Sequence, residues 1–250
     1  MNVDPSLWGS YAGTFADWEE EGVTLPKPYY ERDGITIYCA DCRDILPLLG
    51  PVDLVLTDPP YGVNGKYGPS YDDSRDGYWN WFLPVVAQMR QAGRVLTFTH
   101  RQFALKEIHD WDWIGAWTKP YAACAHIGNS PIMPHWEPIF MFGIHTLGVR
   151  RARADVFVAN PVPVGAGGKR GRQRLAEEAV GHPRPKPESL FRDLIWLLSD
   201  EGQTILDPFM GSGTTLRAAK DLGRRAIGIE IEEKYCEIAV KRLAQEVMPL

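Results

Sequence analysis

The chain has 250 residues, of which 44% are hydrophobic and 24% are charged, a composition that fits one sizeable globular domain and excludes a disordered or fibrous protein. No stretch approaches the roughly 18 to 20 apolar residues of a membrane-spanning helix, and the polar N-terminal sequence lacks the layout of a signal peptide, so we expect a cytoplasmic protein. The four cysteines are too few for a disulfide framework, and the pair Cys39 and Cys42 lacks the second pair of a zinc site, so we expect no metal.

The net charge of −5 conceals a strongly basic segment. Between residues 148 and 175 there are seven basic residues and a single acidic residue, Asp155. The seven are Arg150, Arg151, Arg153, Lys169, Arg170, Arg172 and Arg174. A basic tract on an otherwise acidic chain suits a protein that binds a polyanion with one face. A solvated loop is the alternative explanation of the tract.

Hydrophobic patterning predicts alternating strands and helices after an extension over residues 1–27. Strands are predicted at 34–40, 53–58, 94–99, 114–119, 137–143, 203–209 and 225–230. Helices are predicted at 78–93, 187–202, 214–223 and 232–247. Stretches rich in turn-forming residues predict an exposed loop at 62–77 and a loop or small insertion at 144–181. The alternation indicates a layered α/β domain.

Two glycines, Gly211 and Gly213, lie between a predicted strand and a predicted helix, where a dinucleotide-type fold needs the backbone to approach a ligand. Glu230 ends the next strand, where a carboxylate can accept hydrogen bonds from both hydroxyls of a ribose. The third glycine of a pyrophosphate-binding turn is missing, and Asp207 precedes the turn. This pattern favours a ligand with an ammonium group beside its ribose, namely S-adenosylmethionine. A turn that only tightens the connection is the alternative.

The sequence "TDPPYG" follows the predicted strand at 53–58, so it lies where open α/β sheets place their ligand crevices. Prolines fix φ and donate no hydrogen bond, so the carbonyl oxygens of this turn are held rigidly. Asp58 and such a carbonyl are two acceptors that suit the two hydrogens of a planar amino group. Tyr61 offers a flat face for stacking a base lifted out of its duplex. An accidental turn is the alternative interpretation.

Together, "TDPPYG" and the later "HPRPKPESLFRDLI" and "TILDPFMGSGTTLRAAKDLG" resemble the β class of S-adenosylmethionine-dependent DNA amino-methyltransferases, in which the catalytic motif precedes the cofactor motif. The resemblance runs from about Pro28 to Leu243 and thins between 144 and 180. It implies a Rossmann-like methyltransferase fold, with a mostly parallel sheet, helices on both faces and permuted motif order. It also implies one domain over residues 1–250: an extension (1–27), a catalytic half (28–143), a short basic target-recognition insertion (144–181) and a cofactor-binding half (182–250).

The resemblance assigns roles to matching residues. Asp58 and the carbonyl of Pro59 would hold the target amine within a catalytic motif completed by Pro60 and Tyr61, and Tyr61 would stack on the flipped base. The cofactor-binding residues that it implies are Asp41, His182, Lys186, Asp207, Pro208, Phe209, Gly211, Ser212, Gly213, Thr214 and Glu230. Among these, Asp41 would lie near the adenine ring, and His182 and Lys186 would close over the methionine end. DNA contacts are expected from Lys66 and from the seven residues of the basic tract.

The implied reaction is direct transfer of the methyl group to the N6 amine of a flipped adenine, without a covalent enzyme intermediate. Adenine is favoured because relatives with aspartate at the first motif position mostly modify adenine, but N4 of cytosine stays open. A protein-glutamine methyltransferase is opposed by Asp58 and by the motif order, and a catalytically inactive DNA-binding module is opposed by the intact motifs. Double-stranded DNA is the expected partner, with a second copy of the chain or a cognate restriction nuclease as further possibilities.

The chain departs from the family pattern in two places. Ala40 replaces the glycine that family members usually show before the first acid, Asp41. The segment in which the family reads its target sequence is short here, at about residues 144–180. Target recognition is therefore expected to be brief or shared with a second subunit.

Overall fold

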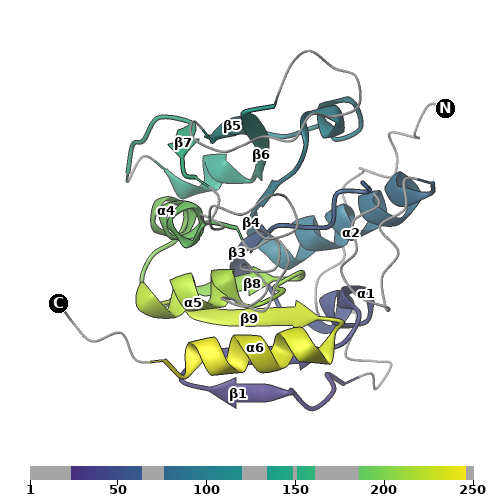
Figure 1. Cartoon of the computed structure of the whole chain (residues 1–250), viewed down its shortest axis with the longest axis vertical. Helices are drawn as coiled ribbons and strands as arrows, with labels where there is room; N and C mark the ends of the chain where they lie inside the picture. The colour runs from purple at the N-terminus through teal and green to yellow at the C-terminus, as the bar shows by residue number, and fades with distance from the viewer. Residues whose placement is uncertain (1–23, 64–75, 120–133, 149–150, 161–185, 246–250) are drawn as a thin grey trace, which may run out of the picture.

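In the computed structural model, the described residues are 24–63, 76–119, 134–148, 151–160 and 186–245, and they form a nine-stranded sheet with helices on both faces (Figure 1). The strands are β1 (Tyr30–Arg32), β2 (Ile35–Cys39), β3 (Val52–Thr57), β4 (Gly93–Thr99), β5 (Trp113–Thr118), β6 (Trp136–Phe142), β7 (Val156–Val158), β8 (Thr204–Asp207) and β9 (Arg225–Glu230). The helices are α1 (Cys42–Ile45), α2 (Tyr78–Ala92), α4 (Glu188–Leu198), α5 (Thr214–Asp221) and α6 (Glu233–Leu243), and the short 3-10 helices are η4 (Leu46–Leu48), η5 (Gln102–Lys106) and η6 (Ile144–Leu147). None of these helices is long and apolar enough to span a bilayer.

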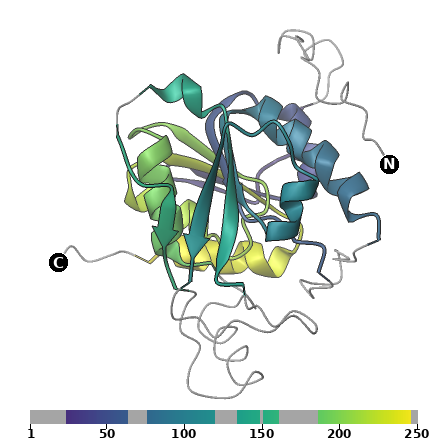
Figure 2. The same ribbon diagram turned by 90° about the horizontal axis from the view of Figure 1, so that it is seen from above.

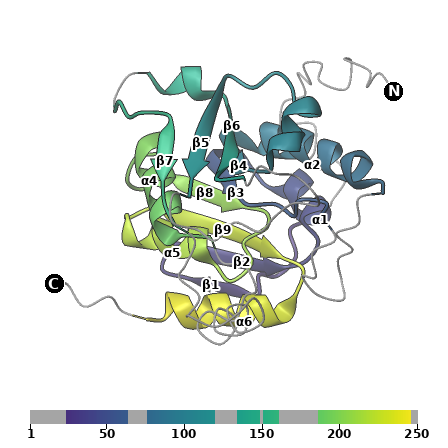
Figure 3. The ribbon, with the colours of Figure 1, turned by 45° about the horizontal axis from the view of Figure 1, so that its top comes forward.

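The sheet is mostly parallel, as expected, with the order β1-β2-β9-β8-β3-β4-β6-β5-β7 (Figure 3). The central strands β2, β9, β8, β3 and β4 pair in parallel, and β7 pairs in parallel with β5. Antiparallel pairing joins β1 to β2 and places β6 between β4 and β5. The strand order reverses between β3 and β8, so their carboxyl ends flank the switch point at which such sheets bind ligands.

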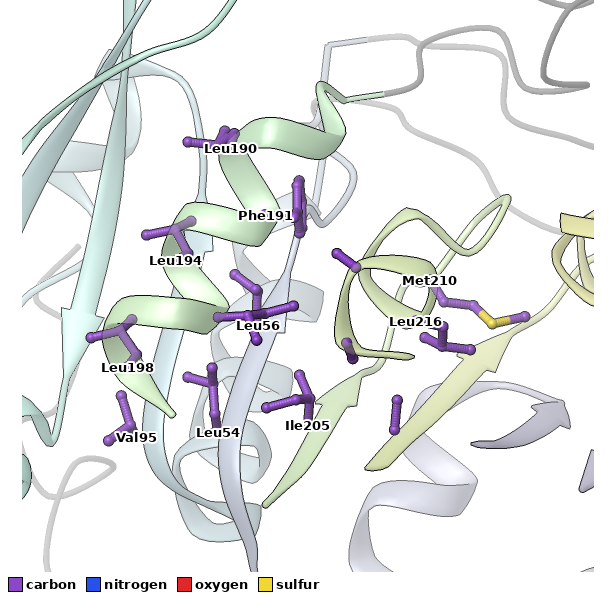
Figure 4. Close-up of a cluster of buried hydrophobic side chains, with 14 of the residues drawn as sticks. Leu54, Leu56, Val95, Leu190, Phe191, Leu194, Leu198, Ile205, Met210 and Leu216 are labelled. Atoms are coloured by element: carbon purple, nitrogen blue, oxygen red, sulfur yellow. The ribbon is translucent and has the colours of Figure 1, made fainter. Parts of the chain in front are cut away.

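The two faces of the sheet are covered by different helices, as Figure 2 shows from above. On one face, α4, α5 and α6 pack on Leu54, Leu56 and Ile205, and Figure 4 shows Leu194 and Leu198 of α4 beside Leu56 and Leu54. On the other face, α1 and α2 pack on Val55 and Phe98. Neighbouring residues of β3 therefore alternate between two cores, which explains why the strand reads as a continuous apolar run.

The predicted strands and helices are confirmed, with ends that differ by a few residues. Residues 144–181 were predicted to be a loop or small insertion. A loop is wrong for Val156–Val158, which forms the edge strand β7, with Phe157 buried against the core. A strand of three residues next to arginines offers too little periodicity to be read from sequence. The division of the chain into functional segments stays a prediction.

Candidate active site

The carboxyl ends of the central strands surround a cavity of about 250 Å³ that is lined by both sequence motifs. The predicted residues that line it are Asp41, Asp58, Pro59, Pro60, Tyr61, Lys186, Asp207, Pro208, Phe209, Gly211, Ser212, Thr214 and Glu230. Two stretches that lie about 150 residues apart in the chain thus meet at one site, because β3 and β8 are neighbours. The predicted residues Lys66, Arg150, Lys169, Arg170, Arg172, Arg174 and His182 lie outside the described residues.

Asp207 connects the two motifs. Its buried carboxylate accepts hydrogen bonds from the Thr57 hydroxyl at 2.5 Å, from the backbone N–H of Phe209 at 3.0 Å and from the Thr215 hydroxyl. Burial raises the pKa of Asp207 to about 6, although the hydroxyls of Thr215 and Thr57 favour its ionised form. Asp207 therefore fixes the end of β3, the end of β8 and the first turn of α5 relative to one another.

The glycine turn brings the backbone close to Glu230. The N–H of Gly211 donates to Glu230 Oε2 at 3.0 Å, and the N–H of Glu232 donates to Oε1 at 2.9 Å. Burial raises the pKa of Glu230 to about 7, against the effect of these two bonds. Each carboxylate oxygen keeps a second acceptor position, so the group can still receive two ligand hydroxyls.

Gly213 precedes α5 and lies against α6. It has φ +80°, and a Cβ at this position would lie 2.8 Å from the Cβ of Ala239 in α6. Among the predicted cofactor residues that are described, it is the one that does not line the cavity. A glycine is required here because α5 approaches α6 closely.

Asp41 caps α1 and pairs with Arg43. It accepts a hydrogen bond from the backbone N–H of Arg43 at 2.9 Å, and the guanidinium Nη2 of Arg43 lies 2.6 Å from Oδ2. Hydrogen bonding to the Arg43 side chain lowers the pKa of Asp41. Both residues line the cavity, so Asp41 presents an ionised carboxylate there.

Asp58 is anchored through one oxygen. Its Oδ1 accepts hydrogen bonds from the Tyr61 hydroxyl at 2.7 Å and from the Thr99 hydroxyl, and it lies 3.1 Å from Lys186 Nζ. Within the described part of the chain, Oδ2 has no such contact. The anchored carboxylate can therefore offer Oδ2 to a donor in the cavity.

A second set of contacts fixes the proline turn. The backbone N–H of Arg101 donates to His100 Nδ1 at 2.9 Å, so the ring proton is on Nε2, which lies 2.8 Å from the Tyr78 hydroxyl. The Tyr78 hydroxyl in turn donates to the Pro60 carbonyl at 2.6 Å. Burial lowers the pKa of His100 to about 3, so the ring is neutral. The Pro60 carbonyl is thus occupied, whereas no described residue donates to the Pro59 carbonyl.

Tyr61 is more enclosed than its predicted stacking role suggests. Its side chain is buried, and its ring stacks on His100 with 4.7 Å between ring centroids. His100 therefore covers one face of the ring, and the Lys186 ammonium also lies over the ring, 4.6 Å from its centroid. The stacking role stays a prediction.

Several site residues were not predicted from sequence: Thr99, His100, Tyr78, Lys119 and Glu137. Thr99 is the last residue of β4, the parallel neighbour of β3, and His100 follows it, so the strand-end rule that located Asp58 also applies to them. Glu137 lies at the start of β6, which runs antiparallel to β4, and its position depends on a pairing that the sequence does not reveal.

The two described residues of the basic tract are paired within the protein. Arg151 Nη2 lies 3.0 Å from Asp200 Oδ1, and Arg153 Nη2 lies 2.7 Å from Asp193 Oδ2. These ion pairs connect the segment before β7 to α4 and to the residues that follow it. A structural role thus accounts for both arginines, and DNA contact by either stays a prediction.

The sequence is similar to known DNA methyltransferases. A family model described as DNA methylase matches residues 154–241. The type II methyltransferase M2.DpnII of Streptococcus pneumoniae is 26% identical over 92% of this chain and 97% of that protein. The DNA adenine methyltransferase YhdJ of Escherichia coli (strain K12) is 26% identical over 77% of this chain and 76% of that protein.

Solved structures share the fold. The M1.HpyAVI–SAM complex superposes with a TM-score of 0.59 at 23% identity, over 84% of this chain and all (100%) of that chain. The cytosine-N4-specific PvuII DNA methyltransferase gives a TM-score of 0.65 at 16% identity, over 91% of this chain and 92% of that chain. The chain therefore has the Rossmann-like fold of these methyltransferases, with helices on both faces of a mostly parallel sheet. Its motifs, the family-model match and these relatives make the chain similar to N6/N4 DNA methyltransferases.

Proposed function

We propose that this protein transfers the methyl group of S-adenosylmethionine to the exocyclic N6 amine of an adenine flipped out of double-stranded DNA. The observation that carries the proposal is the single cavity that Asp58, Pro59 and Tyr61 share with Asp207 and Glu230. Groups that can accept hydrogen bonds from an amine and from ribose hydroxyls line the same cavity. This arrangement suits a reaction between a nucleobase amine and a nucleoside cofactor. The similarity to YhdJ, which is named an adenine enzyme, supports adenine.

The residues of the cavity fit the cofactor. Glu230 has free acceptor positions for the ribose hydroxyls, the turn at Gly211 has no Cβ, and the Asp207 carboxylate provides negative charge. In our proposal, Asp41 is near the adenine ring, and Pro208, Phe209, Ser212 and Thr214 complete the wall. When bound, S-adenosylmethionine supplies a methyl group activated by a positively charged sulfur.

The chain's own residues hold and orient the target amine. Asp58 Oδ2 and the Pro59 carbonyl accept its two hydrogens, which directs the nitrogen lone pair out of the plane of the ring. In our proposal, the ring of Tyr61 supports the flipped base. The hydrogen bond from Tyr78 to the Pro60 carbonyl keeps the turn rigid during the reaction. The proton that the methylated amine releases passes to Oδ2 of Asp58, the acceptor that holds the amine.

The identity of the modified base can be measured directly. The purified protein is incubated with mixed-sequence DNA and S-adenosylmethionine, the DNA is digested, and the nucleosides are identified by mass. We expect N6-methyldeoxyadenosine in the digest. N4-methyldeoxycytidine would establish the alternative substrate, because both bases present an amine beside a ring nitrogen, and the absence of methylated nucleosides would contradict the proposal.

Cofactor affinity is expected to increase with pH. Glu230 and Asp207 have raised pKa values, of about 7 and about 6, so both are partly protonated in the free protein at mildly acidic pH. Ribose hydroxyls and a cationic ligand favour the ionised carboxylates, so binding releases protons. The dissociation constant should rise about tenfold per released proton for each pH unit below these pKa values.

Isothermal titration calorimetry across the pH range, in buffers of different ionisation enthalpy, measures both the affinity and the number of protons released. In Glu230→Gln the part of the pH dependence that begins near pH 7 should disappear. A wild-type dissociation constant that stays constant between about pH 5 and pH 8 would contradict this prediction.

The remaining assignments are also part of the proposal. The basic tract, including Lys169, Arg170, Arg172 and Arg174, and the loop residue Lys66 would contact phosphates. His182 and Lys186 would close the methionine end of the site, and a second copy of the chain or a cognate restriction nuclease would be a partner. A cytoplasmic location stays a prediction from composition.

A further inference from the structure

Lys186 contacts the catalytic motif directly. Its Nζ lies 2.7 Å from the Tyr61 hydroxyl, 3.1 Å from Asp58 Oδ1 and 3.3 Å from Glu137 Oε2. An ammonium group has three N–H donors, which these three oxygens match. The side chain is only 16% exposed, so its charge is held largely out of water by this set of acceptors.

Glu137 holds Lys186 from the opposite side. Its Oε2 accepts a hydrogen bond from Lys186 and lies 3.0 Å from the Tyr61 hydroxyl, and its Oε1 pairs with Lys119. Both lysine ammonium groups also lie near the indole ring of Trp117, at 4.3 Å and 4.9 Å from its centroid. The result is a nearly buried cluster in which two carboxylates balance two ammonium groups.

The Tyr61 hydroxyl alone cannot satisfy both carboxylates. It lies within hydrogen-bonding distance of Asp58 and Glu137 but has one hydrogen to donate. Without Lys186, two like charges would share this hydroxyl in a site of low polarity. Burial would raise the pKa of Glu137, but Lys186 and Lys119 outweigh burial and lower it to about 2. Lys186 is thus the cation that both carboxylates share.

We infer that Lys186 is a positioning residue that holds Asp58 through Oδ1, so that Oδ2 faces the target amine, and that Glu137 acts through Lys186. This inference rests on the proposed function and gives Lys186 a role besides the predicted closure over the cofactor. Among the described residues, the titratable and charged groups around the cluster are Asp58 and Tyr61 after β3, His100 and Arg101 after β4, Lys119 after β5, Glu137 in β6 and Asp207 in β8.

Lys186→Met separates the two roles of this residue. We expect kcat to fall about 10- to 100-fold, because Asp58 loses its orientation. The acid limb of the pH profile of kcat should move to higher pH, since Glu137 loses a cation that lowers its pKa. The dissociation constant of S-adenosylmethionine should change by less than about threefold. Lys186→Arg, which keeps the charge, should leave the acid limb in place even where its larger head group lowers kcat.

Glu137→Gln tests whether Glu137 acts through Lys186. The single variant should lower kcat, and the double variant with Lys186→Met should be no slower than Lys186→Met by more than about twofold. Additive effects would overturn the inference, as would an unchanged acid limb in Lys186→Met or a loss of cofactor affinity as large as the loss of kcat. Calorimetry with S-adenosylmethionine also verifies that each variant is folded.

The exposed pair Lys241 and Glu237 on α6 gives a matched control. Lys241→Met and Glu237→Gln remove the same charges at the surface and should leave kcat and its pH profile unchanged. Wild-type protein assayed in parallel distinguishes a failure of the proposed function from a failure of the inference about Lys186. If the wild type methylates no DNA, the proposed function fails, whereas if it does and Lys186→Met matches it, only the present inference fails.

Discussion

Replacing Asp58 by alanine is expected to lower kcat for methyl transfer to DNA by about 10²- to 10³-fold, the usual cost of removing one preorganised hydrogen-bonding group from an active site. The variant loses the Oδ2 acceptor. It also loses Oδ1, the atom that Lys186 and Thr99 contact. Single-turnover transfer of labelled methyl groups measures the chemical step, and calorimetry measures cofactor affinity. The affinity should stay within about threefold of the wild type, since Asp58 acts on the amine.

Asp58→Asn refines the interpretation of this result. The amide keeps the volume of the side chain but replaces one acceptor oxygen by a donor, so kcat should again fall strongly. Asp110, an exposed residue in the turn between η5 and β5, provides the matched control Asp110→Asn, which should keep full activity. Full methyl transfer by Asp58→Ala would show that the amine is held in some other way.

The second large effect is expected at Gly62, the residue after the catalytic motif. Gly62 has φ +63°, and a Cβ there would lie 2.6 Å from Cγ of the buried ring of Tyr78. Gly62→Ala should therefore cost about 1 to 3 kcal/mol of stability through overpacking and about 1 to 2 kcal/mol through the left-handed backbone. It should also reduce kcat, because a displaced Tyr78 no longer holds the Pro60 carbonyl.

Gly202 separates these two contributions. It has φ +78°, but a Cβ at this position would meet no atom within 4 Å, so Gly202→Ala carries the backbone cost alone. Denaturant unfolding should show the smaller loss of stability for this variant, with kcat unchanged. Equal losses of stability and activity in the two variants would contradict the role assigned to the contact between Gly62 and Tyr78.

The sequence was sufficient to predict the central sheet and the meeting of the two motifs. Strands such as β3 and β8 are buried on both faces, so they appear as apolar runs, and the strand-end rule places Asp58 and Asp207 at one crevice. The four-residue helix α1 and the edge strands β1 and β7 were not predicted, because three or four residues carry too little periodicity.

The polar cluster behind the catalytic motif could not be derived from sequence. Glu137 and Lys119 look like ordinary charged residues at strand ends, and only the antiparallel pairing of β6 with β4 and β5 brings them to Tyr61. The ion pairs of Arg151 and Arg153 were hidden for a similar reason, since their partners lie about 40 to 50 residues further along the chain. Local sequence gives the charge of a residue but not the neighbour that neutralises it.

The pairing of β3 with β8 also has a consequence for the order of folding. Within residues 188–243, β8 pairs with β9 and α5 packs against α4 and α6, whereas the pairing of Leu54 with Ile205 closes a loop of about 150 residues. Long loops close late, because the chain loses conformational entropy on closure before the stabilising long-range contacts have formed. We therefore expect the hydrogen bond between Thr57 and Asp207, and with it a complete cavity, to form only in the last stage of folding.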